Sequence, residues 1–156
     1  MVIGLIGESC TGKTTLANAL KEVFDFKLYS GKEYLAFAKH EANAKQMFKE
    51  YLKSKTKTDE VVLYVITELQ DMNLLPEEGI KILKKSDIKI IKERFKDRMY
   101  GNLPIGVEKM LEKKHGQFDY LNYDLVLTSE ELENNLTAVI NLLKNKEIEI
   151  DRRIHY

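Results

Sequence analysis

The 156-residue chain has one cysteine, two prolines and no tryptophan. A single cysteine excludes an intramolecular disulfide framework and fits a reducing compartment, so we expect a cytoplasmic protein. No apolar run approaches the roughly 18 residues that a membrane-spanning helix needs. The apolar residues 1–6 are too few for a signal peptide and lack its basic start, and we therefore expect no membrane partner.

The chain also lacks an excess of charge of either sign. Lys and Arg together number 25, Asp and Glu together number 25, and the formal net charge is +0. Proteins that bind nucleic acid usually carry a basic excess, so this balance argues against a nucleic-acid partner. Hydrophobic residues make up 44% and charged residues 32%, which is typical of a folded chain, and the length fits one domain.

Arginine is the scarcest charged residue. Only four of the 25 basic residues are arginine, namely Arg94, Arg98, Arg152 and Arg153. A guanidinium is planar and offers several donors in a fixed fork, whereas an ammonium is a compact point charge. We therefore expect that a position which keeps arginine in this lysine-rich chain needs that geometry.

Short apolar runs alternate with amphipathic segments along the chain. The expected strands are 2–6, 26–29, 61–66, 79–83 and 125–127. The expected helices are 13–24, 31–53 (as one or two helices), 87–100, 104–116 and a last one that follows a capping box at 128–131. This order predicts an α/β three-layer domain, in which a parallel sheet is covered by helices on both faces. From Lys146 the pattern alternates again, which favours an edge strand or a loose tail.

A phosphate-binding motif lies between the first expected strand and the first expected helix. Residues 7–14, Gly-Glu-Ser-Cys-Thr-Gly-Lys-Thr, fit the pattern G-x-x-x-x-G-K-[ST]. The glycines let successive amides turn toward an anion, and the helix N-terminus adds its positive dipole end. Lys13 would place a positive charge at the β- and γ-phosphates, and the Thr14 hydroxyl would ligate Mg²⁺. The expected nucleotide-binding residues are Gly7, Glu8, Ser9, Cys10, Thr11, Gly12, Lys13, Thr14 and Thr15.

Two arginines are candidates for the same site. Arg94 and Arg98 are four residues apart, so they share one face of the expected helix 87–100. Fixed guanidinium groups stabilise the charge that develops during phosphoryl transfer. A solvated helix face with local ion pairs explains the same spacing, but the phosphate motif and the scarcity of arginine favour the catalytic interpretation.

A carboxylate near the end of a neighbouring strand usually completes the Mg²⁺ site of such proteins. Glu68 follows the expected strand 61–66 and is the first candidate, with Asp71 second. An acidic residue that favours the start of a helix explains either position equally well.

Four stretches resemble the P-loop nucleoside monophosphate kinases, particularly the small cytidylate-kinase-like enzymes and, in the last third, guanylate kinases. They are 7–16, 28–38, 91–99 and 118–127, in the family's order. The resemblance implies one P-loop NTPase domain over residues 1–156, with a helical acceptor-binding segment at 30–58 and a lid at 94–106. It implies an enzyme that uses ATP and Mg²⁺ and transfers the γ-phosphoryl group to a small-molecule acceptor, commonly a nucleoside monophosphate.

Matching positions within this resemblance assign roles to individual residues. Lys13 and Thr14 would hold ATP and Mg²⁺, and the two arginines Arg94 and Arg98 would close over the phosphates. The acceptor would be bordered by Ser30, Gly31 and Tyr34, although Tyr34 equally suits a helix core.

The chain departs from the family at the acceptor site. Leu35 stands where the family has the arginine that binds the acceptor phosphate, and the Thr-Thr-Arg-x-x-Arg element of guanylate kinases is absent. Three interpretations stay open. The acceptor phosphate meets lysine instead, the acceptor is a non-nucleotide metabolite, or the chain is an ATP-binding sensor without efficient transfer. The candidate lysines are Lys27, Lys32 and Lys39.

Overall fold

A computed structural model describes residues 1–154, with side chains described as far as residue 147. All five expected strands are present and form one parallel sheet with the order β2-β3-β1-β4-β5. The strands are β1 (Val2–Ile6), β2 (Phe26–Ser30), β3 (Val61–Ile66), β4 (Ile80–Lys84) and β5 (Leu125–Leu127). The strand that precedes the phosphate motif is therefore the central one, and the motif leaves the sheet at the carboxyl end of β1.

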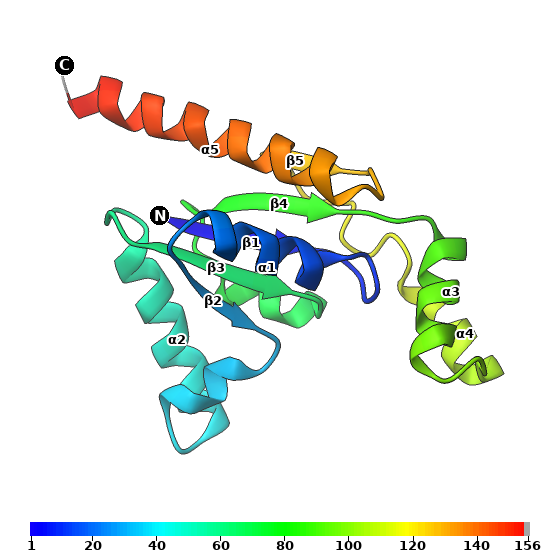
Figure 1. The fold of residues 1–156 in the computed structure, drawn as a ribbon. Helices are drawn as coiled ribbons and strands as arrows, with labels where there is room; N and C mark the ends of the chain where they lie inside the picture. The colour runs from blue at the N-terminus through cyan, green and yellow to red at the C-terminus, as the bar shows by residue number, and fades with distance from the viewer. Residues whose placement is uncertain (155–156) are drawn as a thin grey trace.

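Helices cover both faces of this sheet, as the alternating order of elements predicts (Figure 1). They are α1 (Lys13–Val23), α2 (Glu41–Lys55), α3 (Ile88–Arg98), α4 (Ile105–Lys114) and α5 (Leu132–Ile154), with the short 3₁₀ helices η1 (Glu33–Phe37) and η2 (Leu69–Leu74). The helices α1 and α5 pack on one face, and α2 packs on the other. The helices α3 and α4 form a hairpin beyond the end of the sheet (Figure 1). The expected three-layer α/β fold is confirmed.

The core is divided by the sheet into two apolar clusters. Alternate residues of β1 contribute to each, with Ile3 and Leu5 facing α1 and α5, and Val2 and Ile6 facing α2. Because a central strand of a covered parallel sheet is buried on both sides, all of its residues are apolar or glycine. The cluster beneath α2 is rich in aromatic rings, and the Phe48 ring meets a tyrosine ring of β3 at 4.9 Å between centroids.

Two expectations for the C-terminal region are wrong. Helix α5 follows residues 128–131 as expected, but no described hydrogen bond joins Thr128 and Glu131 as in a capping box, and the Glu131 amide donates to the Ser129 hydroxyl instead. The helix also continues to Ile154, so the segment from Lys146 is helical and is no edge strand. Its alternation is short, and it is rich in Lys and Glu, which favour a helix that is already formed. None of the described helices is long and apolar enough to cross a membrane.

Candidate nucleotide-binding site

The phosphate loop, residues 7–12, adopts a conformation that requires glycine at both ends. A Cβ at Gly7 would lie 2.4 Å from the backbone oxygen of Lys84, which is closer than atoms can approach. Gly12 has a φ of 91°, in the left-handed region that favours glycine, and it immediately precedes α1. The loop therefore packs against the end of β4 and directs the backbone into the first turn of α1.

Cys10 also has left-handed backbone geometry, with a φ of 64°. Its side chain is buried in an apolar cluster with Ile91 of α3 and Leu111 of α4. The motif allows any residue at this position, but in the structure the Cys10 side chain forms a contact that joins the phosphate loop to the α3–α4 hairpin.

Lys13 is almost completely buried, with 5% of its surface exposed. Its Nζ donates to the backbone oxygen of Glu8 at 2.6 Å, and the Thr11 hydroxyl donates to the same oxygen at 3.0 Å. Burial lowers the pKa of Lys13 to about 8, and the nearby charges of Arg98 and Lys84 act in the same direction. The ammonium therefore lies in a poorly solvated environment, where an anionic partner would interact with it strongly.

A pocket of about 100 Å³ lies over the phosphate loop. Arg98 reaches it from α3, and Thr67 reaches it from the end of β3. The lining residues are Ser9, Cys10, Thr11, Gly12, Lys13, Thr14, Thr15, Thr67 and Arg98. Within the described part of the chain, no hydrogen bond or ion pair engages the Arg98 side chain. The structure thus brings Lys13, Thr14 and Arg98 together.

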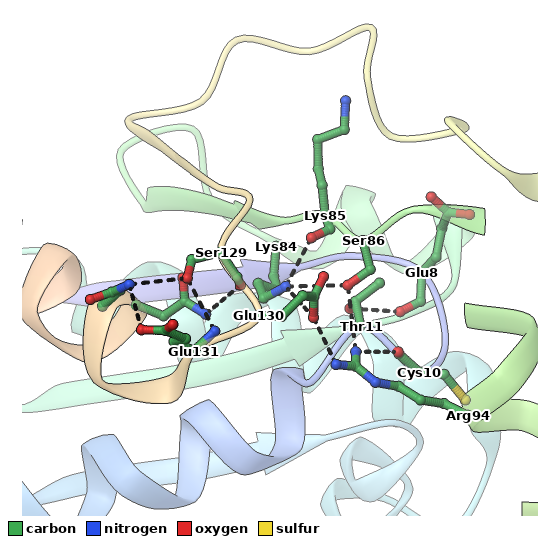
Figure 2. A network of polar contacts seen from close by, with 12 residues as sticks. Glu8, Cys10, Thr11, Lys84, Lys85, Ser86, Arg94, Ser129, Glu130 and Glu131 are labelled. Carbon is green, nitrogen blue, oxygen red and sulfur yellow. Dashed lines mark hydrogen bonds and ion pairs between the residues drawn. The ribbon is translucent and has the colours of Figure 1, made fainter. Parts of the chain in front are cut away.

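Arg94 lies beside this pocket but is held by other groups (Figure 2). Its Nη1 donates to the Cys10 backbone oxygen at 3.0 Å, and its Nη2 donates to Glu130 Oε2 at 2.7 Å. The same carboxylate lies 3.7 Å from the Nζ of Lys84, which is buried at the end of β4. Burial opposes the ionised form of Glu130, but hydrogen bonds from Ser86 and Arg94 and the charge of Lys84 hold its pKa below the usual value.

The two acidic candidates for the Mg²⁺ site lie in different surroundings. Glu68 precedes η2 with its side chain exposed, and its carboxylate is 3.8 Å from the Nζ of Lys114. Asp71 is buried, and this burial raises its pKa. The described residues contain no group of three or more His, Cys, Asp or Glu side chains able to hold a metal. Mg²⁺ bound with ATP keeps several phosphate and water ligands, so the Thr14 hydroxyl with one carboxylate would be enough for this ion. Thr14 lines the phosphate pocket, whereas Glu68 and Asp71 lie outside its lining.

The expected acceptor residues lie at the carboxyl end of β2, outside the lining of the phosphate pocket. The amide and the hydroxyl of Ser30 both donate to Glu33, at 3.0 and 2.8 Å, and Gly31 has a φ of 56° in the turn between them. Tyr34 is 2% exposed and packs on Phe48, so its ring belongs to the core. A role in acceptor binding stays a prediction for all three expected residues.

Several residues around the pocket have roles that the sequence did not suggest. The Glu8 carboxylate accepts from the Gly116 amide at 3.2 Å and lies 3.1 Å from Nδ1 of His115, which fastens the segment after α4 to the phosphate loop. No sequence pattern identifies three further residues near the loop, namely Glu130, Lys84 and Ser86. Their partners are distant along the chain, and a buried lysine at a strand end has no local pattern to mark it.

Comparison with known proteins gives no matching family model and no matching curated protein. Solved structures do match over nearly the whole chain. An uncharacterized protein from Eubacterium ventriosum aligns with a TM-score of 0.66 and 16% identity, covering 92% of this chain and 98% of that one. Shikimate kinase from Acinetobacter baumannii aligns with a TM-score of 0.62 and 14% identity over 93% of each chain. Deoxyadenosine kinase from M. mycoides aligns with a TM-score of 0.59 and 15% identity, covering 92% and 100%.

The chain has the fold of the P-loop kinases. This agrees with the fold that the resemblance implies. The matching structures are named as kinases of different molecules, such as shikimate and deoxyadenosine. The fold alone therefore does not identify an acceptor for this chain.

Proposed function

We propose that this protein is an ATP- and Mg²⁺-dependent phosphotransferase that moves the γ-phosphoryl group to a small-molecule acceptor. The observation that carries the proposal is the pocket in which Lys13, Thr14 and Arg98 meet over the loop 7–12. The residues that line this pocket carry backbone amides, an ammonium, a hydroxyl and a guanidinium, which are the groups that in-line phosphoryl transfer needs.

Each of these groups has a distinct task in the proposed reaction. Phosphate oxygens replace the Glu8 backbone oxygen as partner of the Lys13 ammonium, and Arg98 neutralises charge on the transferred group. Thr14 and Glu68 would hold the Mg²⁺, which supplies further neutralisation of the phosphates. An acceptor oxygen attacks the γ-phosphorus in line with the departing ADP, and no covalent enzyme intermediate is required.

A lid at 94–106 is part of the proposal. This segment contains the end of α3 and the turn into α4, where Tyr100 and Gly101 both have positive φ values of 58° and 86°. When such a segment closes, it keeps water out of the site, so the phosphoryl group passes to the acceptor and ATP is not hydrolysed.

A nucleoside monophosphate is the acceptor that the resemblance favours. The lysines that would replace the missing arginine, Lys27, Lys32 and Lys39, form no ion pair with any described residue, so they are free to bind a phosphate. The second candidate is a hydroxylated metabolite without phosphate. It is favoured by the absence of arginine before Arg94. It is also favoured by the pairing of Lys45 with Glu41, which neutralises a cation of the proposed acceptor segment.

A coupled assay of ADP formation tests the proposed function directly. The acceptor panel contains CMP, dCMP, UMP, GMP, AMP and dTMP, together with nucleosides, hydroxylated acids and sugars. We expect acceptor-dependent ADP formation by the wild type, none by Lys13→Ala, and wild-type rates from Lys21→Ala, an exposed lysine of the same helix. ATP binding without acceptor-dependent ADP formation across the panel would instead support the sensor interpretation.

A further inference from the structure

We infer that Arg94 and Glu130 form a positioning pair that keeps the phosphate loop in the shape that binds ATP, and that Arg98 is the arginine of α3 that faces the phosphates. The inference rests on the proposed nucleotide site, but it concerns ATP binding and does not depend on phosphoryl transfer. The sequence suggests that both arginines bind the phosphates, whereas this inference gives that role to Arg98 alone and makes Arg94 a positioning residue.

The first step of the argument is the difference between the two guanidinium groups. Arg98 lines the pocket and is not engaged by any other described residue. Arg94 uses both terminal nitrogens on the protein itself, one on the Cys10 backbone oxygen and the other on Glu130. With Nη1 on the Cys10 carbonyl oxygen and 3.5 Å from Ser86 Oγ, and Nη2 on the Glu130 carboxylate, the Arg94 guanidinium is fixed by protein groups and its charge is balanced by a carboxylate.

The second step is the conformation of the residue that Arg94 holds. Cys10 carries a Cβ and has a φ of 64°, a region that residues other than glycine adopt at an energetic cost unless their surroundings hold them there. Two contacts hold Cys10, namely the burial of its side chain against α3 and α4 and the hydrogen bond from Arg94 to its carbonyl oxygen. The peptide units that follow Cys10 carry amides of the phosphate loop. If the backbone of Cys10 changes conformation, these amides no longer point toward a bound phosphate.

The third step is the role of Glu130 as the group that directs Arg94 (Figure 2). Its carboxylate lies between two cations, with Arg94 Nη2 at 2.7 Å and Lys84 Nζ at 3.7 Å. Lys84 is 2% exposed, and its Nζ also donates to the Lys85 backbone oxygen at 2.8 Å. Removal of the carboxylate leaves two like charges facing each other, one of them buried, and Arg94 then turns away from the loop.

A direct role of Arg94 at the phosphates predicts the opposite outcome for one variant. If Glu130 merely restrains a phosphate-binding cation, Glu130→Gln releases Arg94 toward ATP and the affinity rises. If Arg94 positions the loop, Glu130→Gln disorders the Cys10 peptide and the affinity falls. The sign of the change therefore separates the two roles.

Titration calorimetry with ATP and Mg²⁺ provides the test, on the full chain as wild type, Arg94→Ala, Glu130→Gln and the double variant. We expect each single variant to bind ATP about tenfold more weakly, and the double variant to bind no more weakly than Arg94→Ala, since the two residues act through one contact. Arg98→Ala should change the affinity by less than about threefold, because its interaction strengthens mainly in the transition state. Glu131→Gln changes the neighbouring carboxylate, which accepts from Asn134 and forms no described contact with Arg94, and it is the matched control.

Other results would overturn the inference. These are unchanged affinity in Arg94→Ala, tighter binding by Glu130→Gln, or losses that multiply in the double variant. Circular dichroism establishes that each variant is folded. Arg94→Lys serves as a second probe, because an ammonium cannot span both partners and is expected to lose affinity as Arg94→Ala does. A wild type that binds ATP but transfers no phosphoryl group would contradict the proposed function and leave this inference standing.

Discussion

The ammonium of Lys13 titrates in an accessible range because burial lowers its pKa to about 8. Phosphate binds the protonated form, so we expect the affinity for ATP to fall as the pH rises from about 7 to about 9. Calorimetric titration across that range measures the effect. Lys13→Arg, whose side chain stays charged throughout, should show a much flatter profile, and an equally steep profile in this variant would assign the pH dependence to another group.

The same lowered pKa has a consequence for stability. In the unfolded chain Lys13 has the ordinary value of 10.5, so between about pH 8 and 10.5 the unfolded state binds more protons than the folded state. The cost of burying the charged lysine is present below pH 8 and is relieved as the pH rises through this window. Denaturant unfolding without nucleotide should therefore show a contribution that increases with pH and that Lys13→Met removes.

Gly7 is the position at which the loop tolerates a side chain least. A Cβ there meets the Lys84 backbone oxygen at 2.4 Å, so Gly7→Ala forces a backbone shift and should cost about 1–3 kcal/mol of unfolding free energy. Gly106→Ala is the matched control, because nothing lies within 4 Å of its Cβ and it belongs to α4. That change should stabilise the protein by about 0.5–1 kcal/mol. Similar thermal shifts in both variants would contradict this account.

At the scale of elements, the α3–α4 hairpin is joined to the phosphate loop through a small apolar cluster. Leu111 is buried there with Cys10 and Ile91, whereas the neighbouring Met110 is 39% exposed. Leu111→Ala should lower the unfolding free energy by about 2–3 kcal/mol and weaken ATP binding as well, because it loosens the support of Cys10. Met110→Ala should change stability by less than about 0.5 kcal/mol, and a loss of stability without a loss of ATP affinity in Leu111→Ala would disprove the coupling.

Local patterns explain which elements could be predicted from the sequence. The strand β1, the phosphate loop and the start of α1 are contiguous, and each position has a local physical reason, so the motif and its placement were predictable. The contacts of Arg94 were not, because Cys10 and Glu130 lie 84 and 36 residues away in the chain. The alternation from Lys146 favours an edge strand or a loose tail, but it is too short to outweigh the helix that precedes it, and α5 continues to Ile154.

At the scale of the whole molecule, the order of strands and helices predicted a covered parallel sheet, and the fold of the P-loop kinases confirms it. The acceptor is not predictable in the same way. Its site depends on side chains from several elements, and the residues proposed for it, such as Tyr34, also serve the core. A shared fold does not specify the molecules that bind to it, because these depend on the side chains of the individual site.

The rate of phosphoryl transfer in a single turnover of wild type and Arg98→Ala tests the central claim most directly. With an acceptor found by the panel, we expect Arg98→Ala to lower the transfer rate by about 10²–10³-fold while ATP affinity stays nearly unchanged. Lys89→Ala, a change at an exposed residue of α3 outside the proposed lid, should transfer at the wild-type rate. A wild-type transfer rate in Arg98→Ala would contradict the account.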